Sequence, residues 1–244
     1  MHKNNMNILI PMAGEGKRFF DYDSPKPLID VNGKPMIQRA IESLDIDGKY
    51  IFIIRESHDT KYLKNTLSNI VDDPIFIEIN YTTEGPASTC LLAEKYINNN
   101  VPLITANCDQ ILKWNSKAFL KYTELPCDGV VVTYTTQTEK NSYVKLDSNH
   151  EYAVEFAEKK VISNYSLNGI HYWKKGRYFV ESAKQMINEN LKVNNEFYIA
   201  PSYNQMIKNN KKIKIFHLLP GQHWAIGTPE DLNKYLSAYK DEEI

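Results

Sequence analysis

The chain has 244 residues and a formal net charge of −1, and this length suffices for one large α/β domain whose core needs no disulfide bonds. Acidic and basic residues are interspersed, so the sequence has neither the basic surface typical of nucleic-acid binding nor a charged tail. No apolar run is long enough to span a bilayer, and three cysteines without metal-ligand spacing predict a reduced, cytoplasmic compartment.

The first half of the chain alternates predicted strands and helices. The strands are expected at 7–12, 50–54, 74–81, 101–106 and 129–136, and the helices at 35–44, 57–70, 86–97 and 116–124. Ser57 is the expected cap of the second helix, and Tyr62 is expected on its buried face. Strand–helix units of this length form parallel sheets that helices cover on both faces. The sequence therefore predicts an α/β fold with a Rossmann-like, mostly parallel sheet flanked by helices.

The second half begins with strand-like segments that have no helix between them, at 143–146, 152–157 and 167–173. This pattern predicts a smaller antiparallel layer over the first sheet and over the active site. A helix around 179–187 and short strands at 213–218 and 224–226 follow. The last helix is expected to begin at Thr228-Pro229-Glu230-Asp231, with a threonine cap, a proline at the first position and two acids in the first turn.

A glycine-rich loop follows the first predicted strand. Gly14 and Gly16 let backbone N–H groups approach an anion closely, and Arg18 can bind phosphate oxygens through two N–H groups. Lys26 stands between two prolines, which restrict its backbone and reduce the cost of presenting its ammonium. The spacing matches neither the Walker A loop nor the dinucleotide fingerprint. We interpret the loop as a phosphate site; the alternative is a glycine turn with solvated cations.

Asp109 comes shortly after the predicted strand 101–106, at the edge where open α/β sheets bind ligands. A carboxylate there suits Mg²⁺, which takes one or two carboxylates together with phosphate oxygens. It could instead be a turn aspartate, or part of the Asp-x-Asp of a nucleotide-sugar glycosyltransferase, although residue 111 is isoleucine. Lys159 could bind a second phosphate or form a solvated pair with Glu158.

Several motifs follow one another in the order typical of the sugar nucleotidyltransferase family. The first are Gly-x-Gly-x-Arg at 14–18, Pro-Lys-Pro-Leu at 25–28 and Lys-Pro-Met-Ile at 34–37. The later ones are weaker singly, and they are Thr83–Ser88, Asp109, Glu158–Lys160, Asn168–Ile170 and Gly227–Leu232. Nearly the whole chain is therefore similar to this family, whose members make nucleotide-activated sugars and related head groups.

The resemblance implies a reaction in which an acceptor phosphate attacks the α-phosphorus of a nucleoside triphosphate and pyrophosphate leaves. It implies Arg18, Lys26 and Lys159 as catalytic residues and Asp109 as the ligand of Mg²⁺. The implied nucleotide-binding residues are Met12, Ala13, Gly14, Gly16, Thr83, Glu84, Gly85, Ser88 and Asn107, and the implied acceptor-binding residues are Glu158, Asn168, Gly169, Glu196 and Tyr198.

The same resemblance implies one domain over residues 1–244. Its nucleotide-binding half is 1–137 and its acceptor-binding half is 138–244. The expected partners are a nucleoside triphosphate and a small phosphorylated acceptor, with no nucleic acid and no membrane, and the expected assembly is a monomer or homodimer.

Three positions depart from the family pattern. Ala225 stands where a second metal-binding aspartate is common, Tyr198 where a sugar-binding glutamate is frequent, and Ser142 where a glycine commonly lies under the sugar ring. This pattern resembles the capsule-locus cytidylyltransferases, which implies CTP as donor, phosphoglutamine as acceptor and a role in capsule or surface polysaccharide biosynthesis. The alternatives are a sugar-1-phosphate nucleotidyltransferase, a glycosyltransferase of similar topology, and a non-catalytic nucleotide-binding relative.

Overall fold

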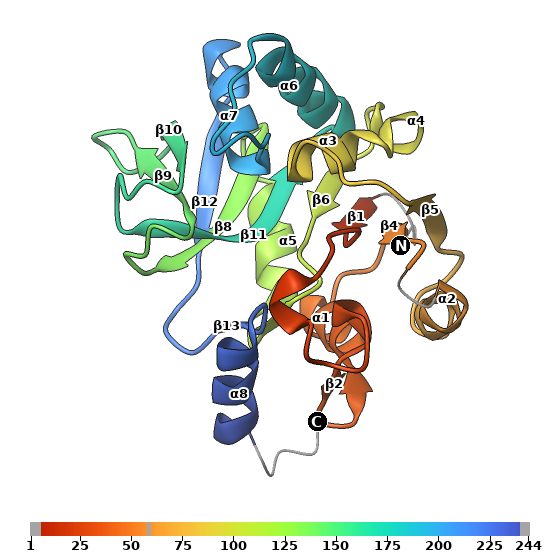
Figure 1. The fold of residues 1–244 in the computed structure, drawn as a ribbon. Coiled ribbons are helices and arrows are strands. Elements are labelled where there is room, and N and C mark those ends of the chain that lie inside the picture. The colour runs from red at the N-terminus through yellow and green to blue at the C-terminus, as the bar shows by residue number, and fades with distance from the viewer. Residues whose placement is uncertain (1–5, 58–59, 240–244) are drawn as a thin grey trace.

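The structure is a computed structural model that describes residues 6–57 and 60–239. Within these residues, nine strands form one central sheet in the order β10-β9-β11-β6-β1-β4-β5, with β8 paired to both β11 and β12 (Figure 1). The strands are β1 (Asn7–Pro11), β4 (Lys49–Arg55), β5 (Ile75–Ile79), β6 (Leu103–Thr105), β8 (Gly129–Thr135), β9 (Ser142–Leu146), β10 (Ala153–Glu158), β11 (Tyr165–Trp173) and β12 (Ile213–His217).

Most strands of this sheet point the same way. The pairs β1–β4, β1–β6, β4–β5 and β8–β12 are parallel, whereas β11 is antiparallel to β6, β8 and β9, and β10 is antiparallel to β9. Only β10 and β11 therefore run against the others in the described sheet. The predicted α/β class with a mostly parallel sheet is confirmed.

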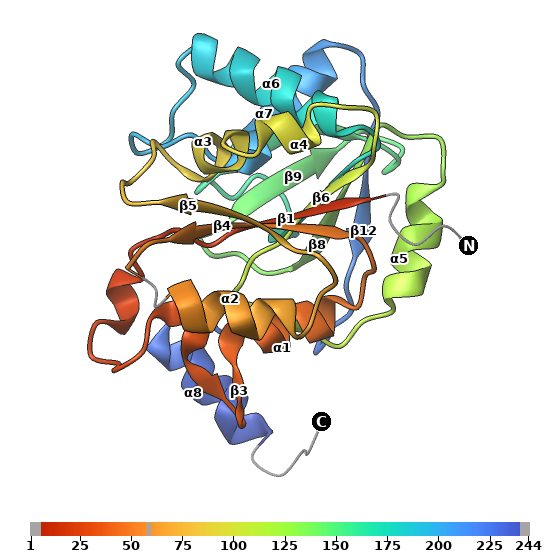
Figure 2. The ribbon, with the colours of Figure 1, turned by 90° about the vertical axis from the view of Figure 1, so that its right-hand side faces the viewer.

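Helices cover both faces of the sheet. Figure 2 shows α3 (Pro86–Leu91), α4 (Glu94–Ile97), α6 (Gly176–Asn188) and α7 (Ile199–Lys208) on one face, with α1 (Met36–Leu44) and α2 (Thr60–Ser68) on the other. Helix α5 (Ser116–Thr123) packs on the α1 face through Phe119. Because Ile8 and Ile10 enter one core and Leu9 the other, β1 is buried on both faces.

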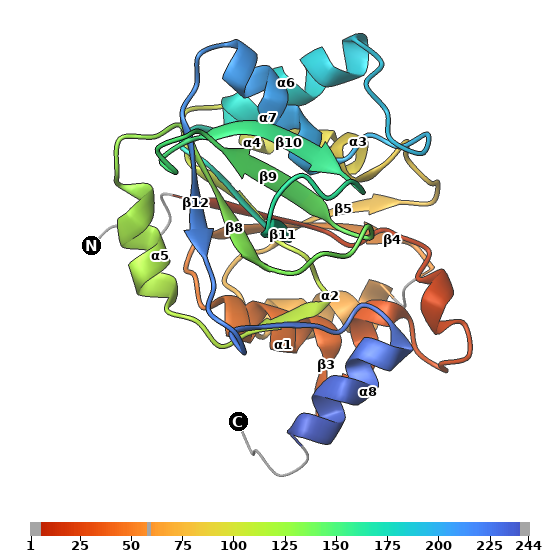
Figure 3. The same ribbon diagram turned by 90° about the vertical axis from the view of Figure 1, so that its left-hand side faces the viewer.

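The antiparallel strands of the second half extend the central sheet (Figure 3). They were expected as a separate layer, but β11 pairs with β6 at His171–Trp173 and therefore continues the parallel half. Two smaller antiparallel pairs lie outside this sheet. They are β7 (Gln110–Leu112) with β13 (His223–Ala225), and β2 (Asp30–Val31) with β3 (Lys34–Pro35).

A bulge in β11 opens the sheet. The register shifts between Leu167 and His171, and Gly169 within it has a φ of +93°, which favours glycine. On one side of this bulge β11 pairs with β6, and on the other side Ser166 pairs with Tyr143 of β9. The sheet thus divides just beyond the end of β6, and the residues after Thr105 lie at this division.

Most predicted elements were confirmed, although α7 was not predicted and two further details differ. The helix expected over 86–97 is divided into α3 and α4, because Leu92 and Ala93 donate backbone hydrogen bonds three residues back. Tyr62 is 55% exposed, whereas Leu63 and Leu67 of the same helix are buried. The predicted cap Ser57 precedes residues 58–59, which lie outside the described residues. None of the described helices has the length and apolar character that crossing a bilayer requires.

Candidate functional site

A cavity of about 1050 Å³ lies where the sheet divides. The loop after β6, the bulge of β11, the end of β10 and the start of α7 all contribute to its wall. The predicted residues that line it are Arg18, Asn107, Asp109, Glu158, Lys159, Asn168, Gly169 and Tyr198. The structure therefore brings together predicted phosphate, metal and acceptor residues that are up to 180 positions apart in the chain (18 to 198).

Lys26 and Asp109 form an ion pair, with 2.5 Å between Nζ and Oδ2. Burial, the largest single effect, disfavours the charge of Lys26, but the opposing effects, led by the charge of the Asp109 carboxylate, together leave the pKa of Lys26 raised. Gly227 contacts the same carboxylate so closely that a Cβ there would lie 2.5 Å from Oδ2. A glycine at 227 is therefore required to leave the Asp109 carboxylate in place.

The glycine-rich loop and the Pro-Lys-Pro segment pack against each other. Gly16 has a φ of +66°, and a Cβ on it would lie 3.3 Å from the Cβ of Lys26. The chain then forms a short 3₁₀ turn, η1 (Lys17–Phe19), that contains Arg18, and a second one, η2 (Lys26–Leu28). This contact explains why the two motifs occur close together: the loop positions Lys26 beside Asp109.

The residues present fit a magnesium ion that takes one ligand from the protein and the others from phosphate oxygens and water. Among the described residues, no group of three or more His, Cys, Asp or Glu side chains could hold a metal. Ala225 lines the cavity, and its methyl group cannot bind a cation. Because Mg²⁺ commonly takes one carboxylate and completes its shell with phosphate oxygens and water, Asp109 would suffice as the protein ligand.

Asn107 and Asn168 both lie beside Gly169 at the bulge. A Cβ on Gly169 would lie 2.1 Å from Nδ2 of Asn107, so only glycine leaves room for that amide. The side-chain carbonyl of Asn168 accepts the N–H of Ile170 at 3.0 Å. Nδ2 of Asn168 is buried and has no hydrogen-bond partner in the described part of the chain. Asn168 lines the cavity, so this unsatisfied donor belongs to the cavity wall.

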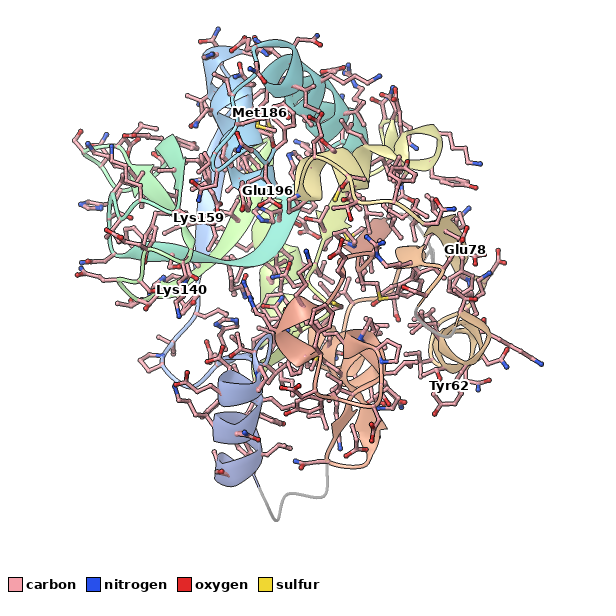
Figure 4. All side chains as sticks on the ribbon, in the orientation of Figure 1. Tyr62, Glu78, Lys140, Lys159, Met186 and Glu196 are labelled. Carbon is pink, nitrogen blue, oxygen red and sulfur yellow. The ribbon has the colours of Figure 1, made fainter. Side chains whose placement is uncertain are left out.

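Several of the predicted acceptor residues belong to a connected set of polar side chains at the cavity. Nζ of Lys159 donates to the hydroxyl of Tyr198, and that hydroxyl donates to Oε2 of Glu196. Figure 4 shows Lys159 and Glu196 close together below α7. The hydroxyl of Ser142 donates to Oε2 of the buried Glu158. Tyr198 therefore joins a cation to a carboxylate, a role that its place in the sequence did not reveal.

Burial raises the pKa of Glu158 above its ordinary value of 4.5, although the hydrogen bond from Ser142 and the charge of Lys159 partly oppose this effect. A carboxyl group with a raised pKa binds its proton more tightly in the folded chain, so it lowers stability as pH rises through that pKa. We expect Glu158→Gln to remove this penalty. Its melting temperature relative to wild type should increase between pH 4.5 and pH 8.

Thermal unfolding followed by circular dichroism across that pH range measures this difference. Glu155→Gln is the matched control, because Glu155 lies on the same strand and is exposed. If the difference in melting temperature between Glu158→Gln and wild type stays constant with pH, the raised pKa does not belong to Glu158.

The other predicted residues lie outside the lining of this cavity. They lie in the loops after β1 and β5, in η2, in α3 and in the segment before α7. They are Met12, Ala13, Gly14, Gly16, Lys26, Thr83, Glu84, Gly85, Ser88 and Glu196. A Cβ on Gly85 would lie 2.6 Å from the backbone nitrogen of Phe197, and that nitrogen donates to the carbonyl of Glu84 at 2.7 Å. Pro86 follows directly and lines the cavity. The predicted nucleotide loops therefore adjoin the cavity.

Arg55 was not predicted as a site residue. Its Nε donates to the carbonyl of Ala13 at 2.8 Å, and its Nη2 donates to Oγ1 of Thr82 at 3.0 Å and to the carbonyl of Tyr81 at 3.3 Å. The sequence feature that could have indicated a site role for Arg55 is its charge. Arg55 directly follows the apolar run 50–54, at the ligand-binding edge of the sheet.

Comparisons with known proteins agree with this fold. The chain is 28% identical over 242 residues to the bifunctional protein GlmU of Methanocaldococcus jannaschii, a match over 95% of this chain and 54% of that protein. The chain spans about half the length of the curated relatives it matches.

Two solved structures share the fold. A nucleoside-diphosphate-sugar pyrophosphorylase from Vibrio cholerae RC9 has a TM-score of 0.80 and 20% identity, over 94% of this chain and 99% of that one. An inositol-1-phosphate CTP transferase from T. maritima has a TM-score of 0.73 and 17% identity, over 97% of this chain and 95% of that one. Residues 8–166 match the family model of the MobA-like NTP transferase domain. Because this match covers more than half of the chain, the protein belongs to the MobA-like NTP transferase family.

Proposed function

We propose that this protein is a Mg²⁺-dependent nucleotidyltransferase that transfers a nucleoside monophosphate from a nucleoside triphosphate to a small phosphorylated acceptor. The observation that carries the proposal is the Lys26–Asp109 pair, at 2.5 Å, on a cavity that Arg18 and Lys159 also line. A carboxylate that is paired with a lysine, close to two further cations, suits phosphoryl-type transfer, which depends on positioning and charge neutralisation more than on covalent chemistry.

In the proposed reaction, an acceptor phosphate oxygen attacks the α-phosphorus, the bond from that phosphorus to the bridging oxygen of the β-phosphate breaks, and pyrophosphate leaves. Arg18 holds the leaving β- and γ-phosphates, Lys26 the α-phosphate, and Lys159 the acceptor phosphate. Mg²⁺ bound through Asp109 would supply neutralisation of the charge on the α-phosphate. Within one domain, residues 1–137 bind the nucleotide and residues 138–244 bind the acceptor.

The proposed substrates are CTP and phosphoglutamine, in capsule or surface polysaccharide biosynthesis. Three hydrogen bonds support a small acceptor over a hexose phosphate: one joins Ser142 to Glu158, and two join the Tyr198 hydroxyl to Lys159 and Glu196. Ring hydroxyls would have to compete with these bonds. The choice of cytidine rests on the motif resemblance, and a structural neighbour described as a CTP transferase is in keeping with it.

Pyrophosphate release should be measured with ATP, CTP, GTP, UTP and dTTP, each combined with phosphoglutamine, phosphocholine, glycerol phosphate and several hexose 1-phosphates. We expect CTP with phosphoglutamine to give the highest kcat/KM, by about tenfold, a discrimination of the size that a few hydrogen bonds provide. A tenfold preference for a hexose 1-phosphate would overturn the acceptor, and a preference for UTP or dTTP would overturn the base.

A sugar-1-phosphate nucleotidyltransferase is the second candidate. A structural neighbour described as a nucleoside-diphosphate-sugar pyrophosphorylase is in keeping with it. Pyrophosphate release with hexose 1-phosphates identifies this activity. A glycosyltransferase or a non-catalytic relative would release no pyrophosphate from any combination in the panel.

A further inference from the structure

Arg55 is the last residue of β4, which lies between β1 and β5 in the sheet. The register pairs Ile53 with Pro11 of β1 on one side and Arg55 with Ile79 of β5 on the other. The side chain at the end of a central strand can therefore reach the loops that follow both neighbours. Its position alone places it between the glycine-rich loop and the loop that leads to α3.

The hydrogen bonds of Arg55 join these two loops. Nε binds the carbonyl of Ala13 in the glycine-rich loop, whereas Nη2 binds the Tyr81 carbonyl and the Thr82 hydroxyl in the loop after β5. The guanidinium is planar and rigid, so donors that point to different loops hold those loops at a set separation. A lysine ammonium lacks this planar arrangement of donors.

A second connection runs beside the first. The Thr82 hydroxyl, which accepts from Arg55, donates to Oε1 of Glu15 at 2.9 Å, and Oε2 of Glu15 is 2.8 Å from Nζ of Lys17. The Arg55–Thr82 contact therefore belongs to a chain of polar groups that ends in the glycine-rich loop itself. Removing either Arg55 or Thr82 would interrupt the same chain.

We infer that Arg55 is a positioning residue that sets the separation between the two loops of the nucleotide-base site, and thereby both nucleotide affinity and discrimination among bases. This inference rests on the proposed function and takes the implied nucleotide-binding residues Ala13–Gly14 and Thr83–Gly85 to be the ones that flank the base. Arg55 contacts the two loops, and we do not propose that it contacts the nucleotide. Its loss should weaken nucleotide binding while the groups around the α-phosphate keep their positions.

The test compares Arg55→Met, Arg55→Lys, Thr82→Val and the Arg55→Met/Thr82→Val double variant. Isothermal titration calorimetry gives the Kd of CTP and of UTP. Pyrophosphate release gives kcat and the KM values of the nucleotide and of the acceptor. We expect Arg55→Met to raise the Kd of CTP by about 10- to 100-fold, the scale of hydrogen bonds from a charged group. It should also reduce the ratio of CTP to UTP affinity, change kcat at saturation by less than about threefold, and leave the acceptor KM unaltered.

Arg55→Lys should restore little of the affinity, because one ammonium cannot bridge both loops. Adding Thr82→Val to Arg55→Met should raise the Kd further, because the Thr82–Glu15 hydrogen bond is a second link between the loops that Arg55→Met leaves in place. Arg177→Met is the matched control. Arg177 donates to Asn100 and Glu181 outside the cavity and both nucleotide loops, so its variant should bind CTP as the wild type does.

An Arg55→Met chain that binds CTP within twofold of wild type would overturn the inference. Equal loss of nucleotide and acceptor binding together with a lower melting temperature would also overturn it, because that result indicates a structural role alone. If the wild type binds CTP but releases no pyrophosphate with any acceptor, the proposed reaction fails, and the Kd values still decide the role of Arg55. A wild-type chain that binds none of the nucleotides overturns both.

Discussion

Replacement of Asp109 by asparagine or alanine should reduce pyrophosphate release by about 100- to 1000-fold at saturating Mg²⁺, the scale of losing a preorganised electrostatic contact to a transition state. Asp109 is the carboxylate on the cavity that pairs with Lys26, and Gly227 packs against it. Asparagine keeps a hydrogen-bond acceptor for Lys26 but lacks the charge that binds a hard cation.

The melting temperature should change much less than the activity. The side chains of Lys26 and Asp109 are 20% and 23% exposed, so water can solvate the remaining ammonium after the substitution. Asp128→Asn is the matched control, because Asp128 also pairs with a lysine, Lys211 at 3.5 Å, but precedes β8 at the opposite edge of the sheet. Wild-type turnover in Asp109→Asn would remove Asp109 from the metal site, and unfolding of both variants would make it a structural turn residue.

Arg18→Ala and Lys26→Ala should each reduce the rate of pyrophosphate release by at least about 100-fold, because each removes a cation that the proposed mechanism places on a phosphate. Arg18→Lys should recover little activity, since an ammonium cannot bind two phosphate oxygens in parallel as a guanidinium does. Arg18 is exposed on the cavity, so its loss should leave the melting temperature unchanged.

Lys26→Ala differs from Arg18→Ala in one respect. It also removes the partner of Asp109, and a variant that keeps the side-chain length, Lys26→Met, separates the loss of charge from the loss of packing against Gly16. Lys64→Ala is the control, because Lys64 pairs with Glu78 on the surface away from the cavity. Full activity in Arg18→Ala would show that the glycine-rich loop is only a turn.

Local patterns in the sequence were enough to predict most elements of this fold. The apolar run at 7–12 predicts a strand that is buried on both faces, and β1 (Asn7–Pro11) occupies that place. Thr228 was expected to cap the last helix, and it accepts the N–H of Asp231 at 3.2 Å at the start of α8 (Pro229–Ala238). Such features depend on residues within a few positions of one another, so their spacing alone specifies them.

The sequence also predicted two residues that the structure brings into contact. Lys26 and Asp109 were each predicted from local context, a lysine between prolines and a carboxylate after a strand, and the fold places them 2.5 Å apart. Their proximity could be expected because loops that follow parallel strands meet at one edge of the sheet.

Tertiary structure alone decided three other features. Strand β11 leaves β6 at Gly169 and pairs with β9, which joins the antiparallel strands to the main sheet and opens the cavity. The Tyr198 hydroxyl bridges Lys159 and Glu196, and Arg55 joins the loops after β1 and β5. Each depends on hydrogen bonds between groups that are distant in the chain. Each such group bonds to a donor or acceptor that the folded backbone brings close to it. The periodicity of the sequence does not predict which group that will be.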